Sequence, residues 1–174
     1  GPPAEQELRL TTGESTGNDR DSALVARWVG AVVAAAEEIR GRTDAQQVAL
    51  VGVTIGATLA AAAVTEGANV SELVLWAPAL SGKAYLQEMR AFQRLVARRY
   101  PETASPHPVL PAGDEEVNGF LISAETVRDL QALDLTQLRW EARHVRRVLV
   151  AGNEPIAPDK ELLDALNSYG LKVD

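Results

Sequence analysis

The sequence predicts an α/β fold with a mostly parallel β-sheet, in a single domain that spans residues 1–174. Three short apolar runs have the composition of buried strands, at 47–53, 71–77 and 148–151. Helical patterns separate these runs, and the first strand, helix and strand have the lengths of a right-handed βαβ unit. We expect both faces of each strand to be buried. The final Leu-Lys-Val is expected to add one more strand.

The helices follow from the spacing of apolar residues. Apolar side chains recur every three or four residues after Asp21, behind a cap at Asp21 or Ser22, which predicts a helix that reaches Ile39. An alanine-rich helix over 58–66 is expected to stop at Gly67. Further helices are predicted over 83–99, 123–133 and 159–169.

The stretch between Pro78 and Arg147 differs from the regular alternation of strands and helices. It holds the predicted helix over 83–99, which is amphipathic and rich in arginine, and the predicted helix over 123–133. Residues 100–116, rich in proline and acidic side chains, are predicted to form a loop between them. We therefore expect a helical insertion into the open sheet.

The composition argues against several classes of protein. With 17 Lys and Arg against 24 Asp and Glu, the formal charge of −7 argues against a nucleic-acid partner. The absence of cysteine excludes disulfides, cysteine zinc sites and a catalytic thiol. No apolar run reaches the roughly 18 residues of a membrane span, and no signal-peptide pattern is visible, so we predict a cytoplasmic protein without membrane contact.

No cofactor or metal is predicted. The Gly52-x-x-x-Gly56 spacing lacks the Gly-x-Gly start of a dinucleotide fingerprint. The two histidines lie in separate segments, and the acidic clusters have the pattern of solvated faces.

The segment with the clearest chemical signal is Gly52-Val53-Thr54-Ile55-Gly56, at the end of the first predicted strand. Its spacing is typical of a nucleophile elbow, in which the two glycines allow a tight, strained turn from strand to helix. Thr54 would then be the nucleophile, and the Ile55 N–H would contribute to an oxyanion hole. The alternative is that the glycines only allow a close turn. The branched Cβ of threonine, which restricts its rotamers, favours this alternative.

Five stretches of the chain carry a resemblance to a known group of proteins. In order they are LRLTTGESTGN, LVGVTIGATLAAAA, SELVLWAPALSGKAYLQEMR, FLISAETVRDLQALDL and VLVAGNEPIAP. They resemble the α/β-hydrolase fold superfamily, and within it the exosortase-associated hydrolase-like and the serine aminopeptidase-like proteins. The first stretch is similar to a glycine-rich loop of the family, with Thr12 where the first glycine would stand. The others resemble the elbow, the next strand, the lid, and the strand and loop that present the catalytic acid.

This resemblance implies a sheet of the α/β-hydrolase type, with a lid over about residues 82–147. It places Thr54 at the nucleophile, Ile55 at the oxyanion donor and Glu154 at the acid, a role that glutamate can fill as aspartate does. An ordinary polar loop residue is the alternative for Glu154. The implied substrate is a small acyl compound (an ester, thioester or amide), which would undergo hydrolysis or acyl transfer.

The resemblance also implies that the domain is incomplete at both ends. The first two strands of the family would precede Leu8, and its catalytic histidine would follow the last strand. An incomplete sheet would expose apolar surface, so we expect self-association or a partner chain.

The two histidines, His107 and His144, precede the last strand. Without a general base, a threonine hydroxyl is a weak nucleophile. The sequence therefore leaves two functions open. One is a hydrolase or acyltransferase of the α/β-hydrolase type. The other is a catalytically inactive module that binds a small apolar ligand or a partner protein.

Overall fold

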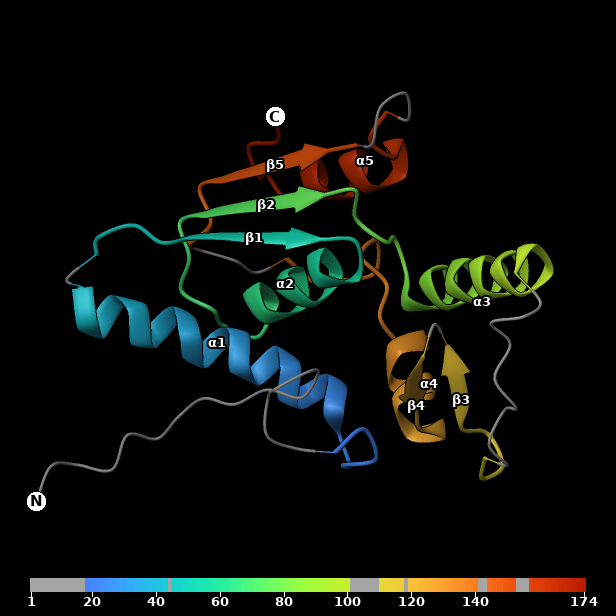
Figure 1. Ribbon diagram of the computed structural model, residues 1–174. Helices are drawn as coiled ribbons and strands as arrows, with labels where there is room; N and C mark the ends of the chain where they lie inside the picture. The colour runs from blue at the N-terminus through green and yellow to red at the C-terminus, as the bar shows by residue number, and fades with distance from the viewer. Residues whose placement is uncertain (1–17, 44, 101–109, 118, 141–143, 153–156) are drawn as a thin grey trace, which may run out of the picture.

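The fold is a three-stranded parallel sheet with helices packed against it, as seen in a computed structural model (Figure 1). The strands are β1 (Ala49–Val53), β2 (Glu72–Trp76) and β5 (Arg147–Ala151), in the order β1-β2-β5. This arrangement confirms the predicted α/β class with a mostly parallel sheet. The structure describes residues 18–43, 45–100, 110–117, 119–140, 144–152 and 157–174.

The helices lie close to their predicted positions. They are α1 (Leu24–Thr43), α2 (Ile55–Thr65), α3 (Gly82–Arg99), α4 (Ala124–Gln131) and α5 (Lys160–Ser168). Side-chain caps explain where three of them begin, because an oxygen on the capping residue satisfies backbone N–H groups of the first turn. Ser81 caps α3, Ser123 caps α4 and Asp159 caps α5.

One face of the sheet is buried under α2 and α5. Leu73 and Leu75 of β2 are fully buried and lie in one cluster with Val148 and Val150 of β5. Leu162 and Leu166 of α5 and the alanines of α2 belong to the same cluster. The small alanine side chains let α2 pack against β1 and β2, while α1 packs against α2.

The opposite face of the sheet is exposed, so the expectation that the strands are buried on both faces is wrong for the described residues. Val51 is 59% exposed and Trp76 is 51% exposed, and Val53 and Leu149 are exposed as well. Consecutive apolar residues predict cover on both sides of a strand. Within the described ranges, the helices that pack against the sheet supply it on one side only.

Between β2 and β5 the chain forms α3, α4 and an antiparallel hairpin, which we call the lid (Figure 1). The hairpin consists of β3 (Glu115–Val117) and β4 (Phe120–Ile122). The sequence prediction of a loop over 100–116 missed this hairpin, because strands of three residues are too short to show alternation. Residues 101–109 of that loop lie outside the described residues.

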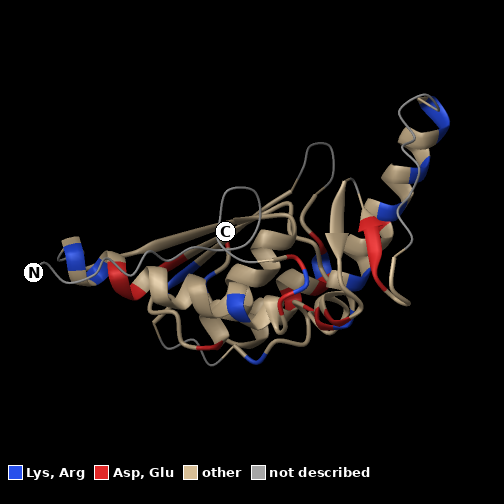
Figure 2. Ribbon diagram, turned by 60° about the horizontal axis from the view of Figure 1, so that its bottom comes forward, with Lys and Arg blue, Asp and Glu red and all other residues tan. Residues whose placement is uncertain are grey.

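The second half of α3 projects from the body and carries arginines at its end (Figure 2). The buried residues of α3 are Gly82 and Leu86, both in its first half. Among the described residues, no helix is long and apolar enough to cross a bilayer.

The predicted final strand is the third correction. Val173 forms an isolated parallel bridge with Val148, so the expected strand is reduced to one pairing position in the structure. The bridge still places the end of the described chain beside β5.

Candidate active site

Thr54 occupies a strained turn between β1 and α2. Its backbone angles are φ 51° and ψ −119°. A positive φ is unusual for any residue with a Cβ and exceptional for a β-branched one, because the side chain crowds the backbone. Such strain costs about 1–3 kcal/mol and persists only where the surrounding structure imposes it.

Gly52 lets the first turn of α2 approach β1. A Cβ added to Gly52 would lie 2.4 Å from the Cα of Ala57 and 2.6 Å from the carbonyl oxygen of Gly56. A Cβ added to Gly56 would meet no heavy atom within 4 Å. The close approach predicted from the two glycines therefore depends on Gly52 alone.

Backbone hydrogen bonds hold Thr54 in this conformation. Its N–H donates to the carbonyl oxygen of Trp76 at 3.0 Å. Its carbonyl oxygen accepts from the N–H groups of Ala57 at 3.1 Å and Ala79 at 3.2 Å. The buried hydroxyl of Thr58 donates to the carbonyl oxygen of Ala79 at 2.6 Å, which ties the segment after β2 to α2.

The side chain of Thr54 remains available for chemistry. Thr54 is exposed, and its hydroxyl makes no capping hydrogen bond to α2. The Ile55 N–H belongs to the first turn of α2, where backbone N–H groups have no partner within the helix. The structure therefore places an exposed hydroxyl next to a backbone donor at the positive end of the α2 dipole.

An apolar cavity of about 480 Å³ lies beside this turn. Residues of α1, α2 and all four lid elements form its wall. They are Trp28, Val32, Ile55, Gly56, Leu59, Tyr85, Leu86, Met89, Val117, Phe120, Ile122 and Leu130. The contribution of α1 to this cavity was not identified from the sequence. The sequence did contain a signal for this contribution, because Trp28 and Val32 are four residues apart and so share one face of a helix.

Among the described residues that line this cavity, Tyr85 is the one with a titratable side chain. Burial raises the pKa of its hydroxyl above the ordinary value of 10.0, and the nearby carboxylate of Glu88 acts in the same direction. A tyrosine hydroxyl with this ordinary pKa is already protonated and neutral near pH 7, and the raised pKa extends that range upward. The part of the cavity wall that the structure describes therefore carries no side-chain charge at that pH.

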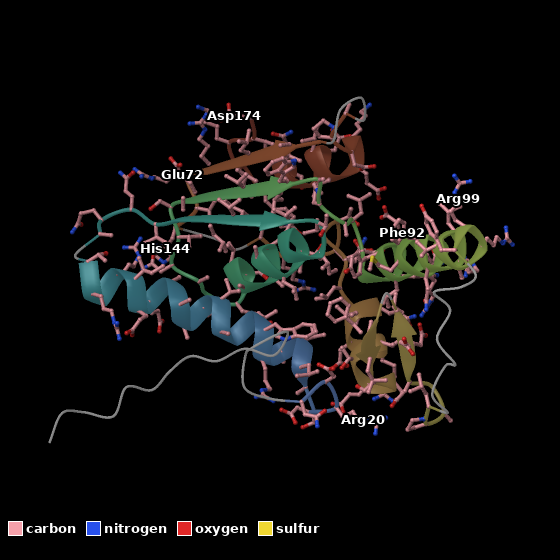
Figure 3. The ribbon with its side chains drawn as sticks, viewed as in Figure 1. Arg20, Glu72, Phe92, Arg99, His144 and Asp174 are labelled. Carbon is pink, nitrogen blue, oxygen red and sulfur yellow. The ribbon has the colours of Figure 1, made fainter. Side chains whose placement is uncertain are left out.

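The described histidine does not reach Thr54. His144 precedes β5, whereas Thr54 follows β1, so they lie at opposite ends of parallel strands (Figure 3). A strand of five residues spans roughly 16 Å, well beyond a hydrogen bond. His107 and Glu154 lie outside the described residues. Of the predicted site residues, the structure brings together Thr54 and Ile55.

No group of three or more His, Asp or Glu side chains with the arrangement of metal ligands occurs in the described part of the chain. The described site thus consists of a hydroxyl, a backbone donor and an uncharged cavity.

Comparison with solved structures identifies the type of fold. The crystal structure of the α/β hydrolase GrgF from Penicillium sp. sh18 superposes with a TM-score of 0.59 and 14% sequence identity, and the match covers 95% of this chain and 68% of that chain. This likeness shows the α/β-hydrolase fold.

A family model then gives the family within that class. The model described as serine aminopeptidase, S33, matches residues 12–157, so the chain belongs to this family of the α/β-hydrolase superfamily. No curated protein matches the sequence.

Proposed function

We propose that the protein is an α/β-hydrolase-type enzyme that hydrolyses an ester, thioester or amide, or transfers its acyl group, with Thr54 as nucleophile. The strained backbone of Thr54 carries this proposal. A β-branched residue at positive φ lowers stability, and an outlier of this kind next to residues that line a cavity, here Ile55 and Gly56, is expected where function requires it.

The proposed reaction begins with attack of the Thr54 Oγ on the carbonyl carbon of the substrate. The carbonyl oxygen then gains negative charge, which the Ile55 N–H and the positive end of the α2 dipole stabilise. The bond to the leaving alcohol, thiol or amine breaks, and the threonine proton passes to that group. Water or another acceptor then attacks the acyl carbon, the bond between that carbon and the Thr54 Oγ breaks, and the proton of the attacking group returns to the Thr54 Oγ.

A general base and an acid complete this scheme. We propose Glu154 as the acid, on the resemblance of its loop to the acid-bearing loop of the family. We assign no base. The position of His144 at the far end of β5 argues against that residue.

The experiment measures turnover of 4-nitrophenyl acetate and butyrate by the protein and by Thr54→Ala and Thr54→Ser. Thr54→Ala is expected to lower turnover to the background rate, and Thr54→Ser to raise it, because a serine hydroxyl has more rotamers. Thr43→Ala is the matched control, since Thr43 lies at the end of α1 and its hydroxyl donates to Ile39. Turnover that survives Thr54→Ala contradicts the proposal.

The second candidate function is a catalytically inactive module that binds a small apolar ligand. The uncharged cavity and the distance of His144 from Thr54 favour it. This function predicts no turnover above background by the unmodified protein, and ligand binding that is equal in the unmodified protein and in Thr54→Ala.

A further inference from the structure

The composition of the cavity restricts what it can bind. The described residues of its wall carry aliphatic, aromatic and thioether side chains. Among them, the neutral hydroxyl of Tyr85 and the indole of Trp28 are the side-chain hydrogen-bonding groups. A charged group of a ligand placed against this wall would lose its hydration without gaining a partner of opposite charge. Its volume of about 480 Å³ lies within the range of about 300–1,000 Å³ that is usual for small-molecule sites.

The α2 helix runs along the cavity and away from Thr54, so its residues order the cavity wall by distance from the nucleophile position. Ile55 follows the nucleophile position directly, and Leu59 lies one turn further along the same helix face. Four residues of α-helix advance about 6 Å, so Leu59 lies farther from Thr54 along α2 than Ile55 does. Ile55 and Leu59 pack in one cluster with Trp28 of α1 and with Tyr85 and Ile122 of the lid.

We propose that this cavity binds the uncharged hydrocarbon part of an acyl group, extended from Thr54 along the Ile55–Leu59 face of α2. Leu59 is then a specificity-determining residue that limits the length of the chain. The orientation of the acyl group rests on the proposed function, because it requires the carbonyl carbon to lie at Thr54. Binding of the hydrocarbon in the cavity does not require turnover.

The first test measures binding of straight-chain 2-alkanones with 4 to 12 carbons by isothermal titration calorimetry. These ketones carry a carbonyl group but no leaving group, so they report binding without turnover. Each methylene that enters an apolar cavity should raise affinity about four-fold, the equivalent of about 0.8 kcal/mol, until the cavity is full. A terminal hydroxyl on a chain of the same length should lower affinity, because it finds few partners.

The second test changes the depth of the cavity. Leu59→Trp should stop the gain in affinity at a shorter chain and lower binding of the longest well-bound ketone at least ten-fold. Leu95→Trp is the matched control, since Leu95 is 64% exposed on α3 and does not line the cavity. Ile122→Trp enters the same cavity from the lid and replaces Leu59→Trp if circular dichroism shows that the latter does not fold.

The outcomes separate this proposal from the proposed function. A rise in affinity with chain length that Leu59→Trp or Ile122→Trp shortens and Leu95→Trp does not supports the proposal, whether or not Thr54→Ala affects turnover. Affinity that does not depend on chain length, or that these cavity variants leave unchanged, overturns the proposal even if Thr54 proves to be the nucleophile.

Discussion

The turn at Thr54 and the lid both lie beside the cavity, but different interactions stabilise each of them. At the turn, backbone groups bond to one another, and the contact between β1 and α2 leaves no space for a methyl group at Gly52. In the lid, side chains make several of the connections. Both oxygens of Glu115 accept from Arg90, at 2.7 and 2.6 Å, and Asp114 accepts from the N–H of Ala124 at 3.0 Å.

This difference indicates which part of the site tolerates amino-acid substitutions. Backbone contacts at van der Waals distance leave little room for substitution, since an added atom must move a whole element. Exposed or half-exposed ion pairs contribute little to stability, so they can be exchanged at low cost. We therefore expect the turn to fix the position of the chemistry and the lid to set which ligand fits.

The largest expected effect comes from Gly52→Ala. Its Cβ would overlap the Cα of Ala57, so we expect a loss of about 3 kcal/mol in the free energy of unfolding. Gly56→Ala is the matched control and should gain up to about 1 kcal/mol, because alanine favours helix more than glycine does. Urea unfolding monitored by circular dichroism measures both. Equal stability of the two variants would contradict the importance of the close approach at Gly52.

A gain in stability is expected for Thr54→Gly, which relieves the strain at positive φ. Relief of about 1–3 kcal/mol, reduced by about 0.5–1 kcal/mol for the extra freedom of glycine in the unfolded chain, leaves a net gain of about 1 kcal/mol. Thr54→Val keeps the branched Cβ and should show no gain. Thermal unfolding compares the three proteins, and a Thr54→Gly protein less stable than the unmodified one would remove strain as an argument for function.

In the described part of the chain, no element covers the face of the sheet on the side away from α2. We propose that this face mediates self-association. Val53→Lys places a charge among exposed apolar side chains on this face. We therefore expect the association constant to fall about ten-fold, the equivalent of about 1.4 kcal/mol. Sedimentation velocity over a range of concentrations measures this change. Asn69→Lys, outside the sheet, is the control, and a monomer at all concentrations for the unmodified protein would reject the proposal.

The smallest expected effect is that of Arg90→Ala in the lid. The ion pair with Glu115 is about 30% exposed at both side chains, so its loss should cost about 1 kcal/mol or less, and less still at high salt. Arg94→Ala is the matched control, because the described part of the chain gives Arg94 no ion-pair partner. A double-mutant cycle with Glu115→Ala isolates the pair. A coupling energy as large as the Gly52→Ala effect would contradict the view that the lid tolerates substitution more readily than the turn.

Much of the fold was predictable because its signals are local. The spacing of apolar residues predicted α1, and the capping residues Ser123 and Asp159 explain where two later helices start. The hairpin of β3 and β4 was missed, since strands of three residues carry almost no periodic signal. The exposed face of the sheet was also missed, because a run such as Ala49–Val53 has the same composition whether one face or both are covered.

Some features of the candidate site were also predictable from the sequence, and others were not. The spacing Gly52-x-Thr54-x-Gly56 by itself indicated a turn with a nucleophile position, because such turns depend on residues that are adjacent in the chain. The sequence also determined the fold class and the absence of thiol chemistry. Only the tertiary structure decided that Gly52 alone is essential for the close approach and that His144 is remote from Thr54. It likewise decided that α1 completes the apolar cavity. These properties depend on distances between segments far apart in the sequence, which packing sets and local patterns do not encode.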